Sequence, residues 1–299
     1  MHDSHIHISM SPLRENIESD IEEFISLNGK KILTQTTDMT DYQITLDMVT
    51  QLGMKFPNVI DFALGLHPER FENGIINNNL SGVELFKYGQ KQIDIYEEVF
   101  KKNISNITAI GECGLDYYSM YEYNQFTPKQ EEELKEIQRR AFSTLCKLAI
   151  THNLPMSIHS REKNDEKQCV KDTLSILAKE GKGVLRGSFH SYTGDTDLLQ
   201  NILDMGMYVG FNAIITYPSG ENVRDILKKT PLERILFETD GPFLPTQRIR
   251  KNKKALKKYG RPAMLQEIIQ KAAEIKGVSY ERMEEIADKN YTNLFTKKD

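Results

Sequence analysis

Short apolar runs alternate with longer amphipathic segments along most of the chain. Eight strand-like runs are each followed by a helical pattern, and a run of about four to eight apolar residues ahead of a helical period is typical of a βα unit. The runs span residues 2–8, 31–36, 59–65, 107–111, 155–159, 184–190, 207–211 and 234–239. The pattern therefore predicts eight successive βα units.

The clearest helical pattern covers residues 128–151. Pro128 stands near its start and acidic residues crowd its first turns, as expected at a helix N-terminus. Apolar residues recur within it at helical spacing, at Ile137, Ala141, Leu145 and Leu148. A last helix near 280–290 is expected to cap the chain.

Eight βα units in 299 residues are typical of one closed parallel barrel. We therefore predict an α/β protein with the (β/α)₈ TIM-barrel fold, forming a single domain over residues 1–299 with a C-terminal capping helix. An open, doubly wound sheet is the alternative. It would spread the strand ends along a crevice, whereas a barrel gathers them around one point.

Composition indicates in which cellular compartment this domain is expected. With 39% hydrophobic residues the chain can bury a large core, yet no stretch reaches the ~18 consecutive apolar residues of a membrane span, and no signal-peptide pattern opens it. Its three cysteines, Cys113, Cys146 and Cys169, form no CxxC pair, which favours a reducing compartment over a disulfide framework. We expect a cytoplasmic protein with no membrane partner.

Six residues able to bind a metal stand at or near the ends of the strand-like runs. A lone histidine there is more often a hydrogen-bonded scaffold residue, but six at one relative position favour a metal site. Two of them lie two apart in a strand, so their rings share a face, and the carboxyl ends of barrel strands surround one active site. The six are His5, His7, Glu112, His159, His190 and Asp240.

The ligand types indicate the chemistry of this predicted site. Imidazole and carboxylate without cysteine suit Zn²⁺ or Mn²⁺, and Mg²⁺ where oxygen ligands dominate. A single catalytic ion usually takes about three protein ligands, so six predict two divalent ions per chain that share a bridging carboxylate. Glu112 is the expected bridge because its strand lies between the others that carry ligands. The predicted reaction class is hydrolysis.

Several segments resemble the TatD family of metal-dependent deoxyribonucleases. They occur in the family's order from residue 3 to residue 295, and G-E-x-G-L-D and E-T-D-x-P-x-L are the most specific. The segments are DSHIH, GLHP, GECGLDYY, IHSRE, FHSYTG, PLERILFETDGPFL and the terminal N-x-x-x-L-F from Asn290 to Phe295. The resemblance covers essentially the whole chain and implies the amidohydrolase type of (β/α)₈ barrel.

The resemblance also implies roles for individual residues. His5, His7 and Asp240 would hold one ion, His159 and His190 the other, and Glu112 would bridge them. Asp240 would also orient the attacking water as a general base, so Glu112 and Asp240 are the expected catalytic residues. Contacts to the substrate phosphate are implied for His67, Arg161 and Arg261.

The activity implied is hydrolysis of phosphodiester bonds in DNA, as a 3′→5′ exonuclease that prefers single strands. Family members take part in DNA repair, DNA breakdown and defence against phage, where the nuclease works with partner proteins. We expect a monomer when the chain is isolated. The resemblance leaves the physiological metal open.

Charge is unevenly distributed along the chain, whose net charge is −4. Between Arg248 and Arg261 there are eight lysine or arginine residues and no acid, so Lys251, Lys253 and Lys254 are expected to contact DNA phosphates. A solvated charged segment is the alternative. Four tyrosines on the same predicted face could stack with bases, although such tyrosines more often pack the mouth of the barrel. They are Tyr117, Tyr118, Tyr192 and Tyr217.

Two other functions compete with the nuclease. A metal site of this kind also hydrolyses carbonyl compounds, so an ester or amide hydrolase such as an aminoacyl-tRNA deacylase is one alternative. A non-catalytic subunit of a larger complex is the other. The complete ligand set stands against it, because loss of activity would usually leave at least one ligand replaced.

Overall fold

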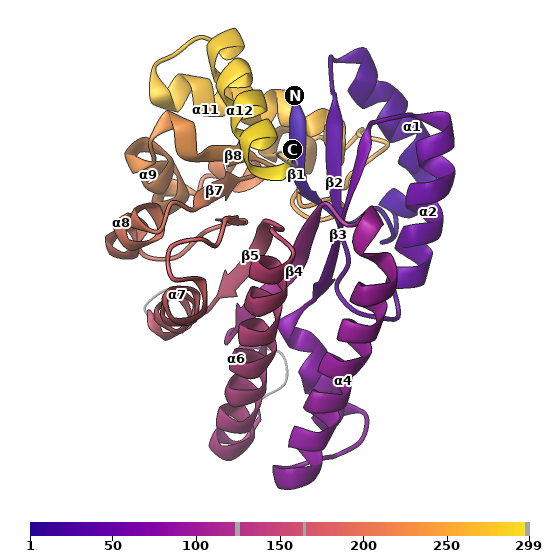
Figure 1. Cartoon of the computed structure of the whole chain (residues 1–299). Helices are drawn as coiled ribbons and strands as arrows, with labels where there is room; N and C mark the ends of the chain where they lie inside the picture. Colours follow the sequence, from indigo (N-terminus) through magenta and orange to yellow (C-terminus); the bar gives the residue numbers. More distant parts are fainter. Residues whose placement is uncertain (123–125, 164–165, 297–299) are drawn as a thin grey trace.

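The computed structural model describes residues 1–122, 126–163 and 166–296, and it confirms the predicted barrel. Eight parallel strands follow one another in chain order around a single sheet (Figure 1). The strands are β1 (His2–Ile6), β2 (Lys31–Gln35), β3 (Ile60–Leu66), β4 (Ala109–Asp116), β5 (Met156–Arg161), β6 (Gly187–Phe189), β7 (Tyr208–Phe211) and β8 (Ile235–Phe237). Every predicted strand-like run overlaps one of them.

The seam between the first and last strands is closed just beyond β8. The amide of Asp240 donates to the carbonyl of His5 at 2.9 Å, and the amide of His7 donates to the carbonyl of Gly241 at 2.7 Å. These two bonds tie the chain that carries Asp240 to the strand that carries both N-terminal histidines. The closure therefore joins residues more than 230 positions apart at the predicted site.

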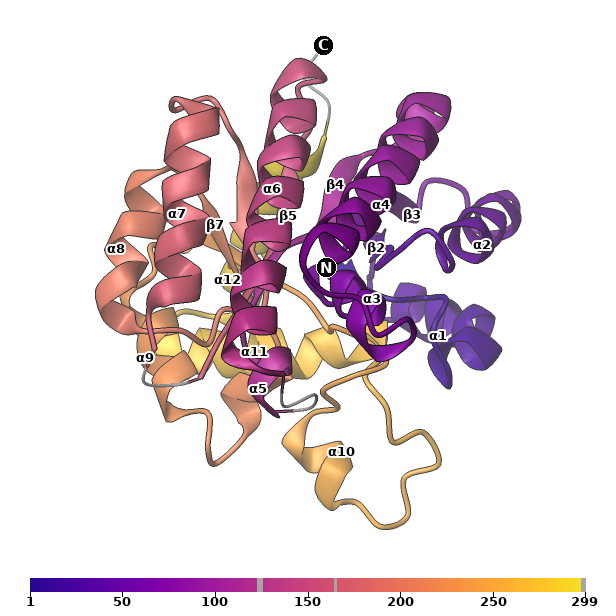
Figure 2. The same ribbon diagram turned by 90° about the horizontal axis from the view of Figure 1, so that it is seen from below.

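Helices surround the sheet and cover its outer face (Figures 1 and 2). They are α1 (Leu13–Ser26), α2 (Tyr42–Lys55), α3 (Asn73–Ile76), α4 (Gly82–Asn103), α5 (Ser119–Glu122), α6 (Pro128–Thr151), α7 (Gln168–Gly181), α8 (Thr196–Asp204), α9 (Glu221–Lys229), α10 (Gln247–Lys251), α11 (Leu265–Lys276) and α12 (Tyr280–Phe295). None of the helices in the described part of the chain is long and apolar enough to cross a lipid bilayer.

Helix α6 has the bounds that the sequence predicts, for a local reason. Thr127 and Gln130 form a capping box, in which each side chain bonds to the other residue's backbone, and Pro128 occupies the first turn. Ile137, Ala141 and Leu145 are buried, as their spacing requires. The signals for this helix are thus all contained in its own sequence.

Two expectations about local structure are wrong. The Asn-rich stretch between Pro68 and a helix near 91–101 has the composition of a long loop at the rim of the active site. It is instead largely helical, since a 3₁₀ helix covers Pro68–Glu72, α3 follows it, and α4 already begins at Gly82. Strand β4 runs on to Asp116, so Glu112 lies inside a strand and not after one. Glycine at 111 and 114 interrupts the apolar run there, which hides the continuation of the strand from a periodicity argument.

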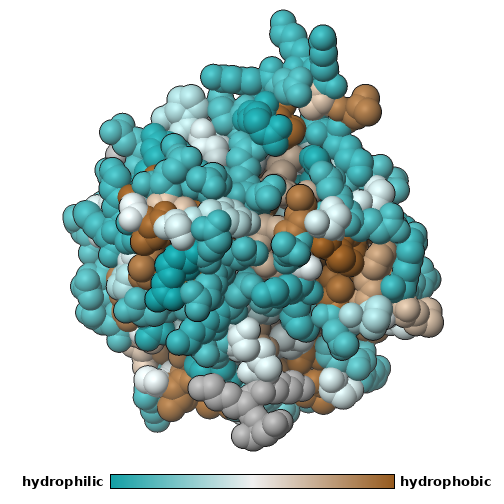
Figure 3. Space-filling model, turned by 90° about the horizontal axis from the view of Figure 1, so that it is seen from above, coloured by the Kyte–Doolittle hydropathy of each residue, from teal (hydrophilic) through white to brown (hydrophobic). Residues whose placement is uncertain are grey.

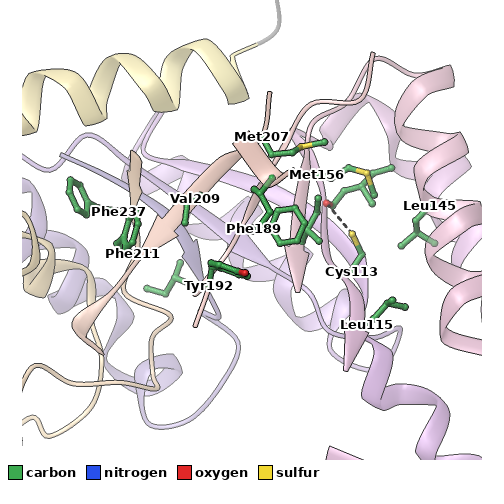
Figure 4. Close-up of a cluster of buried hydrophobic side chains, with 14 of the residues drawn as sticks. Cys113, Leu115, Leu145, Met156, Phe189, Tyr192, Met207, Val209, Phe211 and Phe237 are labelled. Atoms are coloured by element: carbon green, nitrogen blue, oxygen red, sulfur yellow. Dashed lines mark hydrogen bonds between the residues drawn. The ribbon is translucent and has the colours of Figure 1, made fainter. Parts of the chain in front are cut away.

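The core has two parts. Most apolar side chains pack between the strands and the outer helices, where Figure 4 shows Phe189, Met156 and Leu145 among them. A second cluster lies where the C-terminal turns of α12 meet five strands. Figure 1 places α12 across the end of the barrel at which the chain begins, and hydrophilic residues cover most of the surface on that side (Figure 3).

Candidate metal centre

The six predicted ligands converge at the other end of the barrel. His5 and Glu112 lie within β1 and β4, His159 lies within β5, and the other three follow strands β1, β6 and β8. Four of the six are buried, and the side chains of His159 and Asp240 are only 12% and 15% exposed. In an open sheet with the same strand order, β1 and β8 would lie at opposite edges. Closure of the barrel sets β1 beside β8 and across from β5, and this brings the six groups together.

Glu112 stands between two groups of histidines. Its Oε2 lies 3.5 Å from His5 Nε2 and 3.4 Å from His7 Nε2. Its Oε1 lies 2.8 Å from His159 Nδ1 and 2.7 Å from His190 Nε2. One carboxylate thus presents a different oxygen to each group, which is the geometry that a bridging ligand requires.

Asp240 completes the first group. Its Oδ1 lies 3.6 Å from His7 Nε2 and 3.9 Å from His5 Nε2. The backbone of Asp240 has a φ of 53°, in the left-handed region that residues other than glycine seldom adopt. Such conformations persist where the surrounding structure enforces them, and here the amide bond to His5 does so.

The electrostatics of the centre keep both carboxylates ionised. Burial alone would raise the pKa of Glu112, but the nearby His67, His190 and His5 hold it well below its usual value. Burial and His7 oppose each other in the same way at Asp240, whose pKa is also lowered. Burial would lower the pKa of His159, yet its bonds to Asp116 and Glu112 raise it to about 9.

Two side chains behind the ligands were missed by the sequence reasoning. Asp116 Oδ2 accepts from His159 Nε2 at 2.8 Å, which leaves Nδ1 facing Glu112. Ser157 Oγ lies 2.9 Å from His5 Nδ1, which leaves Nε2 facing the centre. Partners of this kind fix the ring orientation of a metal-binding histidine. Alternation along β4 places residues 112, 114 and 116 on one face, a signal that could have identified Asp116.

Glu238, two residues before Asp240, is a third side chain that the sequence reasoning missed. It is fully buried and accepts from the amide of Ser191 and the hydroxyl of Ser4. Its Oε1 also lies 3.6 Å from His190 Nδ1, longer than a hydrogen bond. Glu238 therefore joins β1, β6 and β8 beneath the site.

The residues present fit divalent metal ions. Nitrogens of His5 and His7 face each other at 3.2 Å, and those of His159 and His190 at 3.3 Å. Two imidazoles bound to one tetrahedral Zn²⁺ would place their nitrogens about 3.3 Å apart, from Zn–N distances of about 2.0–2.1 Å. Three combinations bring donor atoms within 4.8 Å of one another: His5, His190 and Asp240; His5, His7 and Glu112; and His67, Glu112 and His159.

The centre opens into a cavity of about 1520 Å³. His67 lines it, with Nε2 3.5 Å from Glu112 Oε1, so this residue could serve a metal as well as a phosphate. Arg161 also lines the cavity, and its guanidinium lies 4.1 Å from the ring centre of Tyr118. Both residues predicted to contact phosphate on this wall therefore face the space where a substrate would bind.

The basic run lies outside this cavity. Figure 2 shows α10 and the chain after it projecting from the body of the protein. Lys251, Lys253 and Lys254 are exposed there and do not line the cavity. Arg261 is also absent from the cavity wall, because its guanidinium is paired with Glu23 at 3.1 Å. Contacts of these four residues with phosphate stay predictions.

An eight-stranded parallel barrel with histidines and carboxylates gathered at the carboxyl ends of its strands defines a class of proteins, the metal-dependent hydrolases. Within this class the chain belongs to the TatD-related DNase family, whose model matches residues 2–296. The family predicted from the sequence motifs is therefore confirmed. The match covers every one of the six predicted ligands.

Relatives and solved structures agree with this assignment. The chain is 27% identical over 98% of its length to YcfH of Escherichia coli K12, an uncharacterized metal-dependent hydrolase, and covers 94% of that protein. It is 24% identical to the similarly named YabD of Bacillus subtilis, with 98% of each covered. In fold it is similar to the TatD homolog YjjV of Escherichia coli K12, with a TM-score of 0.76, 20% identity, and 100% and 98% of the two chains covered.

Proposed function

We propose that this protein is a deoxyribonuclease that hydrolyses phosphodiester bonds in single-stranded DNA from the 3′ end, using two divalent ions. The observation that carries the proposal is the position of Glu112, with one oxygen toward His5 and His7 and the other toward His159 and His190. Mg²⁺, Mn²⁺ or Zn²⁺ suits this donor set. The family name supports DNA as the substrate.

The charge of the cavity wall favours an anionic substrate only once the ions are present. Seven carboxylates line the cavity, against three permanently basic side chains, Arg70, Arg161 and Lys163. Two divalent ions would add four positive charges and offset the excess of acids. Binding of DNA is therefore expected to depend on the metal, and not only the cleavage step.

The chain's own residues then have distinct tasks. Divalent ions, when bound, supply the positive charge that stabilises the attacking and leaving oxygens of an in-line displacement. Asp240, with its lowered pKa, accepts the proton of the attacking water on a carboxylate oxygen. His67 and Arg161 face the non-bridging phosphate oxygens across the cavity.

The basic run supplies a surface for the rest of the strand. Lys251, Lys253 and Lys254 are exposed, and a DNA backbone passing them would release condensed counterions. Replacing the three lysines by glutamine should weaken DNA binding and flatten its dependence on salt. An unchanged salt slope would leave the run as solvated surface.

The experiment that tests the proposal measures products from single-stranded DNA labelled at either end, with Mg²⁺ or Mn²⁺. Asp240→Asn and a sample treated with EDTA serve as controls. Stepwise release from the 3′ label, lost in both controls, is the expected result. Cleavage that persists with EDTA or in Asp240→Asn would contradict it. If DNA is left intact, aminoacyl-tRNA esters are the next substrate class to assay.

A further inference from the structure

Phe243 is an aromatic side chain that the core does not use. Half of it is exposed (50%), whereas each of the other twelve phenylalanines is buried or partly buried. A single exposed apolar side chain is common on a protein surface, so it is the position of Phe243, and not its exposure alone, that points to a role. Phe243 lines the cavity above the metal centre.

The ring is held close to the proposed chemistry. Its centre lies 6.0 Å from that of His7, in an edge-to-face arrangement at 73°. It follows Asp240 by three residues, and its own amide donates to the Asp240 carbonyl at 2.9 Å. In a nucleotide one sugar separates the phosphate from its base. A nucleotide with its phosphate at the metal centre could therefore bring its base to the ring of Phe243.

The backbone around Phe243 is fixed before any substrate arrives. The amide of Gly260 donates to the carbonyl of Pro242 at 2.8 Å. A Cβ at position 260 would lie 1.8 Å from the carbonyl oxygen of Phe243, so glycine is required for this close approach. A ring on such a support loses little conformational freedom when a ligand binds against it.

The four tyrosines considered as stacking partners do not offer such a face. Tyr117 and Tyr192 are fully buried, with 1% exposed, and Tyr217 is buried with its hydroxyl bonded to the Pro245 carbonyl. Tyr118 lines the cavity but carries the guanidinium of Arg161 over its ring. Phe243 is therefore the aromatic face that remains accessible among the residues described around the cavity.

We propose that Phe243 is the stacking platform for the nucleobase attached to the phosphate under attack. The inference rests on the proposed nuclease function and deepens it. Stacking on an aromatic ring requires no particular base, because every base has a π-face. The platform would thus position a terminal nucleotide of any sequence while the metal centre acts on its phosphate.

The test compares intact single-stranded DNA with the same strand lacking the base at the cleaved nucleotide. Phe243→Ala should raise KM for intact DNA by about tenfold, within the range known for loss of one aromatic–base stack. KM for the abasic strand should not change, and Phe243→Tyr should behave as the wild type. Ile76→Ala is the matched control, since Ile76 is equally exposed (52%) on the same cavity but is not aromatic.

A binding measurement separates this inference from the nuclease proposal. A 3′-terminal 2-aminopurine, bound with Ca²⁺ in place of a metal that supports cleavage, should lose fluorescence with the wild type and Ile76→Ala but not with Phe243→Ala. Equal losses by Phe243→Ala on intact and abasic strands would overturn the platform. So would unchanged quenching in Phe243→Ala. If the wild type quenches 2-aminopurine with Ca²⁺, Phe243→Ala does not, and no DNA is cleaved with Mg²⁺ or Mn²⁺, Phe243 stacks with a terminal base and the nuclease proposal alone fails.

Discussion

The two ends of the barrel are built on opposite principles. At one end, the four predicted histidine ligands and Asp240 crowd around Glu112, and the buried Nδ1 atoms of His7 and His190 have no hydrogen-bond partner within the described residues. At the other end, Tyr291, Leu294 and Phe295 of α12 pack against apolar side chains of five strands. Unpaired buried polar groups are costly, whereas buried apolar contacts are stabilising.

This contrast teaches where each kind of change should act. Substitutions at the polar end remove groups that would bind an ion, so they should alter activity and metal affinity far more than folding. Substitutions at the apolar end should alter folding and leave the chemistry unchanged in the molecules that remain folded. A substitution at the apolar end that changed the activity of folded molecules would show that the two ends are coupled.

The largest effect is expected from Glu112→Gln. Loss of the negative charge between the two histidine groups should lower kcat/KM at least about 1000-fold, the scale for removing a catalytic carboxylate or a charge-stabilising group. The melting temperature in EDTA should change little, because the amide keeps the volume of the side chain. Glu285→Gln, at a side chain 70% exposed on α12, provides the control. Near-normal turnover by folded Glu112→Gln would rule out the bridging role.

Leu294→Ala tests the apolar end. Leu294 is 2% exposed, so truncation should lower the free energy of unfolding by about 2–5 kcal/mol, as for other buried leucines. Denaturant unfolding measures the loss, and activity per folded molecule should be unchanged. Leu256→Ala, at a fully exposed leucine (101%), should cost nothing measurable. A loss of kcat in Leu294→Ala at temperatures where the protein is folded would show that the ends communicate.

Asp116→Asn tests whether Asp116 supports metal binding indirectly, through its hydrogen bond to His159. The amide can still accept from the amides of Tyr118 and Ser119, but it no longer presents a charge to His159 Nε2. Metal affinity should fall about 10- to 100-fold, as for other partners of metal-binding histidines. Titration of activity against metal concentration would show recovery at high metal. A loss that no concentration of metal restores would argue for a direct catalytic role.

The smallest effect is expected from Asp288→Asn. Asp288 lies on α12 and bonds to His2, at the start of β1. Burial would raise the pKa of Asp288, but hydrogen bonds from His2 at 2.7 Å and Lys30 at 2.6 Å lower it. A depressed pKa means that the stabilisation is present above the unfolded value near 4 and is lost as the pH falls through the folded value. Asp288→Asn should therefore cost about 1 kcal/mol at pH 7, and the difference from wild type should narrow as the pH is lowered from about 5 to about 2. A gap in stability that is constant with pH would contradict this account.

Local signals were enough to predict the strands, most of the helices and the convergence of the six predicted ligands. The eight strands and the bounds of α6 follow from apolar periodicity and capping residues, which act over a few neighbouring positions. That the six predicted ligands come together could be foreseen, because the carboxyl ends of parallel strands share one face of a barrel. The continuation of β4 through its glycines and the early start of α4 were missed, since neither has an apolar pattern of its own.

The sequence by itself determined the fold, the family and the chemical type of the site, because these depend on repeated short-range patterns and on motifs in a set order. Only the tertiary structure decided which oxygen of Glu112 faces which histidines, and that Asp116 holds His159 from behind. It also decided that Arg261 is turned to Glu23 while Phe243 stays exposed above the centre. These outcomes depend on distances between strands far apart in the chain, which closure of the barrel sets and no local pattern encodes.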